Sequence, residues 1–198
     1  MKKVLFAICI MGISMATQAQ KTTFGIKGGL NLSTVTSDDD ELSEDGKRLS
    51  TFHVGGIADI GISPSFSIQP QLLLQGKGIS VSHEDHSDDF KFLSLDIPVN
   101  LLYKTKGFFI GGGPNVGINL NGKLHEENDT ETIDFGSAAN EIKRANLGVN
   151  ALVGYQTRSG LLVSANYLAD LTNWRNTAPT WRNNLIGISL GYMFGARK

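Results

Sequence analysis

Beyond residue 20, hydrophobic and polar positions alternate along the chain with a period of two, the pattern of β-strands with two unlike faces. In residues 23–33, for example, Phe24, Ile26 and Leu30 alternate with glycine, lysine and asparagine. The same alternation recurs in seven further segments. The eight predicted strands span residues 23–33, 51–62, 66–79, 91–104, 108–121, 146–158, 161–171 and 185–194.

The connections between these segments alternate strictly between short and long. The short ones are residues 63–65, 105–107 and 159–160, and the long ones are residues 34–50, 80–90, 122–145 and 172–184. This asymmetry is typical of outer-membrane barrels, which have short periplasmic turns and longer external loops. The pattern predicts an all-β fold, an eight-stranded antiparallel up-and-down transmembrane β-barrel. With an even number of strands, both termini should be periplasmic and the long loops extracellular.

Acidic residues are concentrated in the long connections. The chain has 19 Asp and Glu against 18 Lys and Arg, which gives a net charge of −1, and it has 23 glycines. The balanced charge argues against a basic nucleic-acid binder, and the many glycines argue against a coiled coil. Sixteen of the 19 acids lie in the first three long connections. The other three, Asp59, Asp96 and Asp170, fall on the polar faces of their strands. No acid falls on an apolar face, as a lipid-facing surface requires.

The polar faces should therefore line the interior, which in an eight-stranded barrel is just wide enough to be filled by side chains. We expect a packed polar core, with a small passive pore as the alternative. Lys27 and Asp59, on neighbouring strands, are expected to form an ion pair. The predicted inner residues are Lys27, His53, Asp59, Gln71, Gln75, Lys77, Asp96, Asn100, Asn115, Asn150 and Asp170.

Aromatic residues on the apolar faces lie near the ends of the strands, as in the two girdles of a membrane barrel. Near the short turns and termini are Phe24, Phe66, Tyr103, Phe108, Tyr155 and Phe194, and near the long loops are Phe52, Phe90, Tyr167 and Trp174. A soluble lipocalin-like barrel is the competing architecture. It would not explain two belts, nor a polar face rich in glycine and amides but poor in charge.

The first nineteen residues have the features of a cleaved secretory signal peptide. Met1, Lys2 and Lys3 precede an apolar run over residues 4–15, and small residues follow at 16–19. The barrel domain is then expected to span residues 20–198. The single cysteine, Cys9, lies inside the signal, so the mature chain would contain no disulfide, thiol nucleophile or cysteine-ligated metal.

Several segments together resemble the small outer-membrane β-barrel family of Bacteroidetes-type bacteria, the "porin family" or PorT-like proteins. The matching segments are residues 24–33 (FGIKGGLNLS), 52–56 (FHVGG), 68–73 (IQPQLL), 97–104 (IPVNLLYK), 111–114 (GGGP) and 191–194 (GYMF), with Leu147-Gly148 and Gly154-Tyr155. The resemblance covers essentially the whole mature chain. It implies an eight-stranded barrel inserted by the barrel-assembly machinery, which reads the last strand and its aromatic residue, here Phe194. It implies no shared catalytic residues and no cofactor.

Three groups of residues could carry chemistry, and for each of them a solvated surface is the simpler interpretation. An outer-membrane lipid enzyme would use histidine with serine or aspartate, but none of the histidines (His53, His83, His86 and His125) falls on a lipid-facing position. Residues 83–89 (HEDHSDD) and the acidic run at 38–41 lack the spacing of a calcium loop, so no metal site is predicted. In the acid-free loop 172–184, the Trp-Arg pairs at 174–175 and 181–182 suit anchoring at the lipid headgroups, or else a partner site.

The sequence predicts a non-catalytic membrane scaffold that serves envelope structure or surface interaction. Its expected partners are outer-membrane lipid and lipopolysaccharide, and the assembly machinery during insertion. A passive pore is the alternative, and a lipid-modifying enzyme is third. Pro70, Pro98 and Pro114 fall inside predicted strands, where each should mark a bulge or a local break because proline cannot donate a ladder hydrogen bond.

Overall fold

The structure is a computed structural model, which describes residues 22–37, 46–82, 87–126, 129–136, 138, 141–177 and 179–195. The predicted signal peptide lies outside these residues. The strands are β1 (Thr22–Ser37), β2 (Gly46–Lys47), β3 (Leu49–Gly61), β4 (Phe66–Ser82), β5 (Ser87–Thr105), β6 (Phe108–Glu126), β7 (Asp129–Thr132), β8 (Ala145–Gln156), β9 (Leu161–Asp170) and β10 (Trp181–Phe194).

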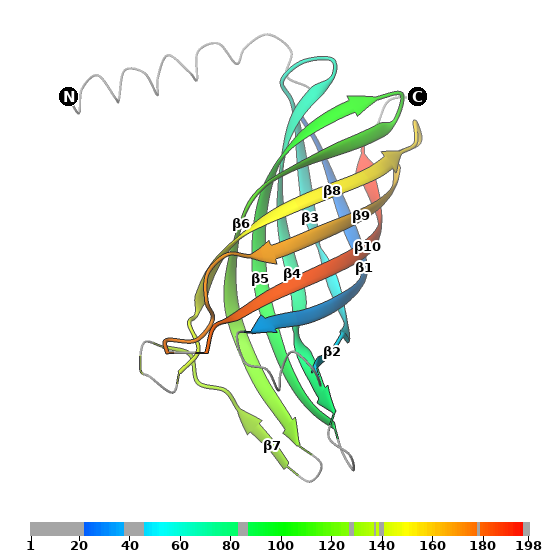
Figure 1. Cartoon of the computed structure of the whole chain (residues 1–198). Helices are drawn as coiled ribbons and strands as arrows, with labels where there is room; N and C mark the ends of the chain where they lie inside the picture. Colours follow the sequence, from blue (N-terminus) through cyan, green and yellow to red (C-terminus); the bar gives the residue numbers. More distant parts are fainter. Residues whose placement is uncertain are drawn as a thin grey trace, which may run out of the picture.

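Eight long strands of the described chain form a closed antiparallel barrel (Figure 1). Each long strand pairs with the next one in sequence, and β1 pairs with β10 from Phe24↔Phe194 to Ser37↔Trp181, which closes the sheet. The short strands β2 and β7 extend the ladder near the long loops, where they pair with β4 and β6. The predicted up-and-down barrel is confirmed.

The short turns lie together at one end of the barrel. Lys106 and Gly107 both have positive φ, 50° and 92°, as a two-residue hairpin between twisted strands requires. The start of β1 and the end of β10 lie at this same end in Figure 1. The strands also reach further into the long connections than the alternation predicts, because backbone pairing continues where both faces become polar. The β4–β5 ladder, for example, runs to Ser82↔Ser87.

The prolines interrupt the ladders without changing the register. The β4–β5 pairing stops at Pro70↔Val99 and resumes in the same register at Leu73↔Asp96. The β5–β6 pairing likewise has a gap after Pro98, opposite the segment that contains Pro114. The predicted local breaks are therefore present. The one register shift between β5 and β6 is elsewhere, between Leu93 and Ser94.

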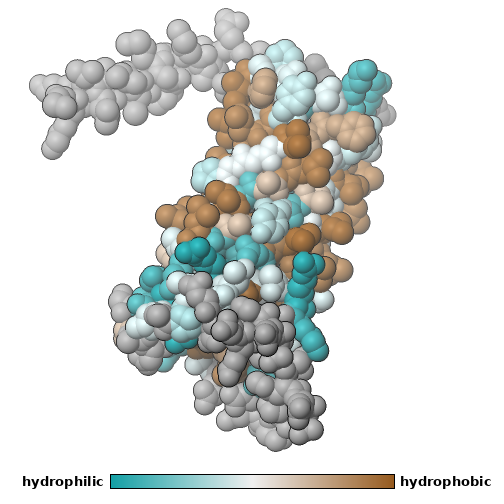
Figure 2. All heavy atoms as spheres, viewed as in Figure 1, coloured by the Kyte–Doolittle hydropathy of each residue, from teal (hydrophilic) through white to brown (hydrophobic). Residues whose placement is uncertain are grey.

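Large apolar side chains face outwards over most of the barrel wall. Leu30 and Ile188, partners across the β1–β10 seam, are 74% and 64% exposed. On the face in Figure 2, hydrophobic residues dominate the wall, and hydrophilic ones gather toward the long-loop end. A soluble barrel would have the opposite arrangement, with its apolar side chains inside and its polar ones outside. The described residues include no helix long and apolar enough to span a bilayer.

Candidate functional site

The interior of the barrel is polar through most of its length, and it contains the residues predicted to lie there. All eleven predicted inner residues are buried, because each occupies one of the alternate positions of its strand that face inwards. They are Lys27, His53, Asp59, Gln71, Gln75, Lys77, Asp96, Asn100, Asn115, Asn150 and Asp170.

An ionic network in the interior joins four strands. Lys77 of β4 has no exposed side-chain surface, and its Nζ lies 2.8 Å from Asp96 Oδ1 on β5 and 3.7 Å from Asp170 Oδ2 on β9. Asn115 of β6 donates a hydrogen bond to the same Asp96 oxygen at 2.7 Å, and Gln75 donates to the other at 3.3 Å. One buried cation thus serves two buried carboxylates, so its removal would leave both without their charge partner.

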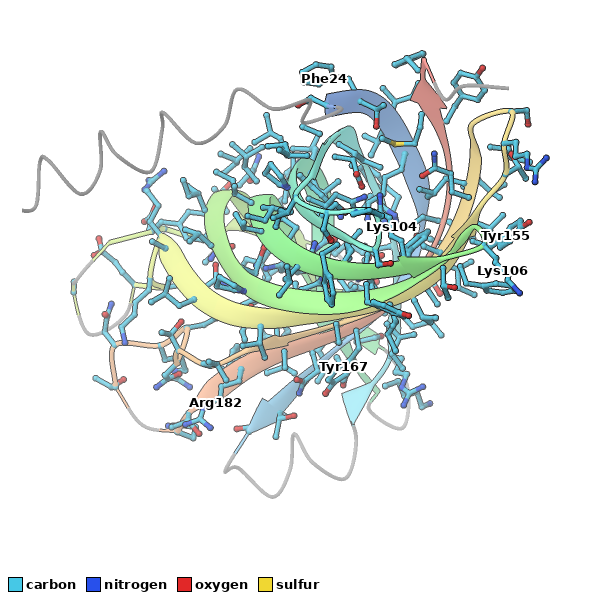
Figure 3. All side chains as sticks on the ribbon, turned by 90° about the horizontal axis from the view of Figure 1, so that it is seen from above. Phe24, Lys104, Lys106, Tyr155, Tyr167 and Arg182 are labelled. Carbon is cyan, nitrogen blue, oxygen red and sulfur yellow. The ribbon has the colours of Figure 1, made fainter. Side chains whose placement is uncertain are left out.

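The expected Lys27–Asp59 ion pair is wrong. Lys27 lies opposite Gly55 in the β1–β3 register, and Asp59 is four residues further along β3, about 13 Å at the rise of a strand. Asp59 instead pairs with Lys104 Nζ at 2.5 Å, at the short-turn mouth. In Figure 3, which looks along the barrel from that end, Lys104 lies inside the ring of strands.

A second buried array links His53 to the two strands of the seam. One ring nitrogen, Nδ1, lies 2.7 Å from Asn31 Oδ1 on β1, and the other, Nε2, lies 2.7 Å from Ser189 Oγ on β10. Serine, histidine and asparagine in this order are residue types of nucleophilic hydrolases. Ser189, however, has 0% exposure, and His53 and Asn31 have 2% and 1%, so no substrate can reach the hydroxyl. This array connects β1, β3 and β10 inside the wall.

An apolar cluster fills the inner face near the short turns, although the sequence pattern predicts a polar interior. Leu102 of β5 and Met193 of β10 are completely buried within it. Leu102 and Met193 each stand between two outward-facing apolar residues. The alternation of polar and apolar positions is therefore lost there, and the sequence pattern does not reveal that these two side chains point inwards. We call this cluster the inner plug; its members are Ile57, Leu102, Phe109, Leu152, Leu162 and Met193.

An aromatic cluster covers the opposite mouth. Trp174 is 0% exposed, and its indole Nε1 donates a hydrogen bond to Asp170 Oδ2 at 2.9 Å. Its ring meets that of Phe92 edge to face, with centroids 4.8 Å apart. We call this cluster the outer cap; it consists of Phe92, Ile142 and Trp174, with Phe90, Ile133, Phe135 and Trp181 packed against them.

The outer cap is held by two long connections that interlock. The side-chain amide of Asn176 donates to the backbone carbonyls of Gly136, Ala138 and Glu141, at 3.2, 2.9 and 2.9 Å. Trp174 N also donates to the Trp181 carbonyl at 2.8 Å. With the inner plug at one end and the outer cap at the other, side chains occupy the interior at both ends as well as in the middle.

The two tryptophans of loop 172–184 are not the headgroup anchors that the sequence predicts. Trp174 belongs to the interior, and Trp181 packs on Phe90 with ring centroids 5.5 Å apart. The guanidinium of Arg175 lies over the Trp181 ring at 5.1 Å. The expectation fails for the tryptophans because the loop folds back over the mouth, which periodicity in a polar segment cannot reveal, whereas Arg182 is exposed.

The aromatic belt near the short turns is confirmed. Phe24 and Phe108 are 62% and 61% exposed, and Phe108 contacts Tyr155 at a centroid distance of 4.7 Å. Figure 3 shows Phe24 and Tyr155 at the outer rim. At the other end only two of the four predicted members, Phe52 and Tyr167, are exposed, because Phe90 and Trp174 belong to the outer cap.

The family comparison agrees with this geometry. A model of the family described as "Outer membrane protein beta-barrel domain" matches residues 18–175. The chain belongs to this family. It is therefore a bacterial outer-membrane β-barrel, and the apolar outer wall is the surface that faces lipid.

Two solved structures have a similar fold. Neisserial surface protein A is 14% identical, with a TM-score of 0.61, over 88% of this chain and 100% of that chain. Ail, the attachment invasion locus protein of Yersinia pestis, crystallised with the heparin analogue sucrose octasulfate, is 13% identical, with a TM-score of 0.51, over 88% and 99%. At these identities the likeness is one of fold. No match was found among curated protein sequences.

Some candidate residues of this outer-membrane barrel are not among those that the structure describes. They include His83, His86, the acidic run 38–41 and the side chain of His125. Within the described residues, no three His, Cys, Asp or Glu side chains come together as a metal site would require.

Proposed function

We propose that this protein is a non-catalytic, non-conducting scaffold that holds its four long connections at the bacterial surface, for envelope structure or surface interaction. The observation that carries the proposal is the filled interior, with the inner plug at one end and the outer cap at the other. A passive pore needs a continuous polar path, and the apolar side chains of the plug oppose the passage of hydrated ions. The resemblance to PorT-like proteins supports membership of the Bacteroidetes-type branch.

The orientation that we propose places the short-turn end in the periplasm. β1 begins and β10 ends at this end in Figure 1, which supports a periplasmic location for both termini. Short turns on the periplasmic side and long connections outside are the general rule for such barrels. The barrel-assembly machinery would then meet β10, with its aromatic Phe194, from the periplasm.

A lipid-modifying enzyme is a weaker candidate. Among the residues that the structure describes, the one array with suitable residue types is Ser189–His53–Asn31, which points into the interior with its hydroxyl buried. Enzymes that act on membrane lipids need their nucleophile accessible from the bilayer or the solvent. We infer that the array stabilises the seam between β1 and β10.

Cysteine labelling tests the proposed orientation directly, because the sequence beyond Cys9 contains no cysteine. Ala138→Cys places a thiol in an exposed part of a long connection, and Lys106→Cys places one in the exposed turn between β5 and β6. In intact cells, a membrane-impermeant maleimide should label Ala138→Cys and leave Lys106→Cys unlabelled until the outer membrane is broken. Labelling of Lys106→Cys alone in intact cells would overturn the orientation and the proposed function.

A further inference from the structure

Exposed basic side chains surround the barrel between its apolar band and its acidic loops. We call these residues the basic collar: Lys47, Arg48, Lys91, Lys123, Arg144 and Arg182. They belong to β2, β5, β6 and β10 or lie directly beside strands β3 and β8. Figure 3 shows Arg182 projecting outwards. In the proposed orientation, the collar lies at the level of the lipid headgroups in the outer leaflet.

Two members of the collar form an unfavourable pair. Lys91 of β5 and Lys123 of β6 are direct partners in the antiparallel register, and both are exposed on the outer face. Directly opposed residues have Cβ atoms about 5 Å apart, and like charges at this distance destabilise a sheet. Among the described side chains, Asp89, whose Oδ2 lies 2.7 Å from Lys91 Nζ, offsets one of the two charges. The pair therefore retains a net positive charge that an anion bound between the ammonium groups would neutralise.

A mostly apolar groove adjoins this pair. It has a volume of about 390 Å³, and Lys91 and Lys123 line it together with Phe52, Gly76 and Leu93. Phe52 and both lysines are exposed, so the groove opens on the outer surface. It lies where the β3–β4 ladder is interrupted, since pairing ends at His53↔Gln75 and β2 resumes it only at Lys47↔Ser80.

We propose that this groove binds lipopolysaccharide, with a lipid A phosphate between Lys91 and Lys123 and an acyl chain along Phe52 and Leu93. A phosphate offers several strong acceptor oxygens to two ammonium donors, and charge-assisted bonds of this kind are the stronger class. The apolar lining contacts the part of the acyl chain nearest the headgroup, which would otherwise contact only neighbouring lipids. The inference rests on the proposed orientation, because only the long-loop end would then meet the lipopolysaccharide leaflet.

Binding to the purified, folded barrel in detergent tests the site without reference to orientation. The probes are lipid A with its phosphates, the same lipid A after dephosphorylation, and phosphatidylglycerol, each quantified by native mass spectrometry of the complex. Lys91→Met with Lys123→Met removes the site. Lys106→Met with Arg158→Met is the matched control, because it removes two exposed cations near the short turns. Unchanged heat-modifiable mobility on a gel verifies that each variant folds.

We expect phosphorylated lipid A to bind the wild type and the control equally, and the collar variant about tenfold or more weakly, since two charge-assisted contacts are lost. Dephosphorylated lipid A should bind the wild type, the control and the collar variant equally, and as weakly as phosphorylated lipid A binds the collar variant. Equal binding to the collar variant and the control would overturn the proposal. Phosphatidylglycerol that binds the wild type as tightly as lipid A would overturn the assignment to lipopolysaccharide. The cysteine labelling separately reports any failure of the orientation.

Discussion

Replacing Lys77 by methionine is expected to destabilise the folded barrel by about 3–5 kcal/mol, the cost of leaving a buried charge without its partner. Lys77 is the cation that faces both Asp96 and Asp170 in the interior, and its side chain has no exposed surface. Methionine has a similar length, so the loss of charge dominates over any change in volume. The free energy of unfolding, from urea titration of the detergent-folded protein followed by tryptophan fluorescence, measures the effect.

Lys91→Met is the matched control for this prediction. Lys91 also pairs with an aspartate, at 2.7 Å, but 46% of its side chain is exposed, and exposed pairs contribute only about 0–1 kcal/mol. Adding Asp96→Asn to Lys77→Met should recover part of the lost stability, because one of the two uncompensated charges is then removed. If the Lys77 and Lys91 variants are equally stable, the ionic network does not hold the strands together as described.

Replacing Trp174 by alanine is expected to cost about 3–5 kcal/mol, the range for truncating a large buried aromatic side chain. The substitution removes the centre of the outer cap, including the ring contact with Phe92 and the hydrogen bond to Asp170. It also weakens the attachment between the two interlocked connections. Besides a lower unfolding midpoint, faster amide hydrogen exchange should appear at Ile133, Phe135 and Ile142, which pack in the outer cap with this ring.

Trp181→Ala provides the comparison, since Trp181 is the other of the two tryptophans in the chain. Trp181 is only partly buried and lies at the edge of the outer cap. Its truncation should therefore cost clearly less than that of Trp174, about 1–2 kcal/mol on the scale of buried apolar area. In the Trp181 variant, the remaining Trp174 emission should resist quenching by acrylamide. Equal destabilisation by the two variants would contradict a buried central role for Trp174.

The sequence predicts most of the barrel wall because a two-sided sheet between lipid and a packed lumen forces a strict period of two. This period determines which side chains face the interior, so it correctly predicts that residues as distant in sequence as Lys27 and Asp170 are both buried. Depth does not follow from it. In the β1–β3 register, Lys27 and Asp59 lie at different depths in the barrel, and Asp59 pairs with Lys104 instead. Only the register of the strands reveals this depth.

The two closures of the lumen depend on contacts that no local pattern contains. The outer cap forms because Asn176 joins one long connection to another across the mouth, and the two tryptophans predicted to reach the headgroups pack in the cap instead. The contact between His53 and Ser189 crosses the seam that closes the barrel, over 136 residues of sequence. The inner plug is also hard to predict, because Leu102 and Met193 stand between outward apolar residues and the alternation of polar and apolar positions is lost there.

Conductance across a planar lipid bilayer tests most directly whether the filled interior makes this barrel a scaffold or a conduit. The chain from Gln20 onwards would be refolded in detergent, checked for heat-modifiable mobility on a gel, and added to the bilayer under an applied voltage. The inner plug and the outer cap predict a baseline current with no unitary steps, for the wild type and across the voltage range. Reproducible, voltage-driven unitary steps from the folded, homogeneous protein would contradict the sealed lumen and favour the passive pore.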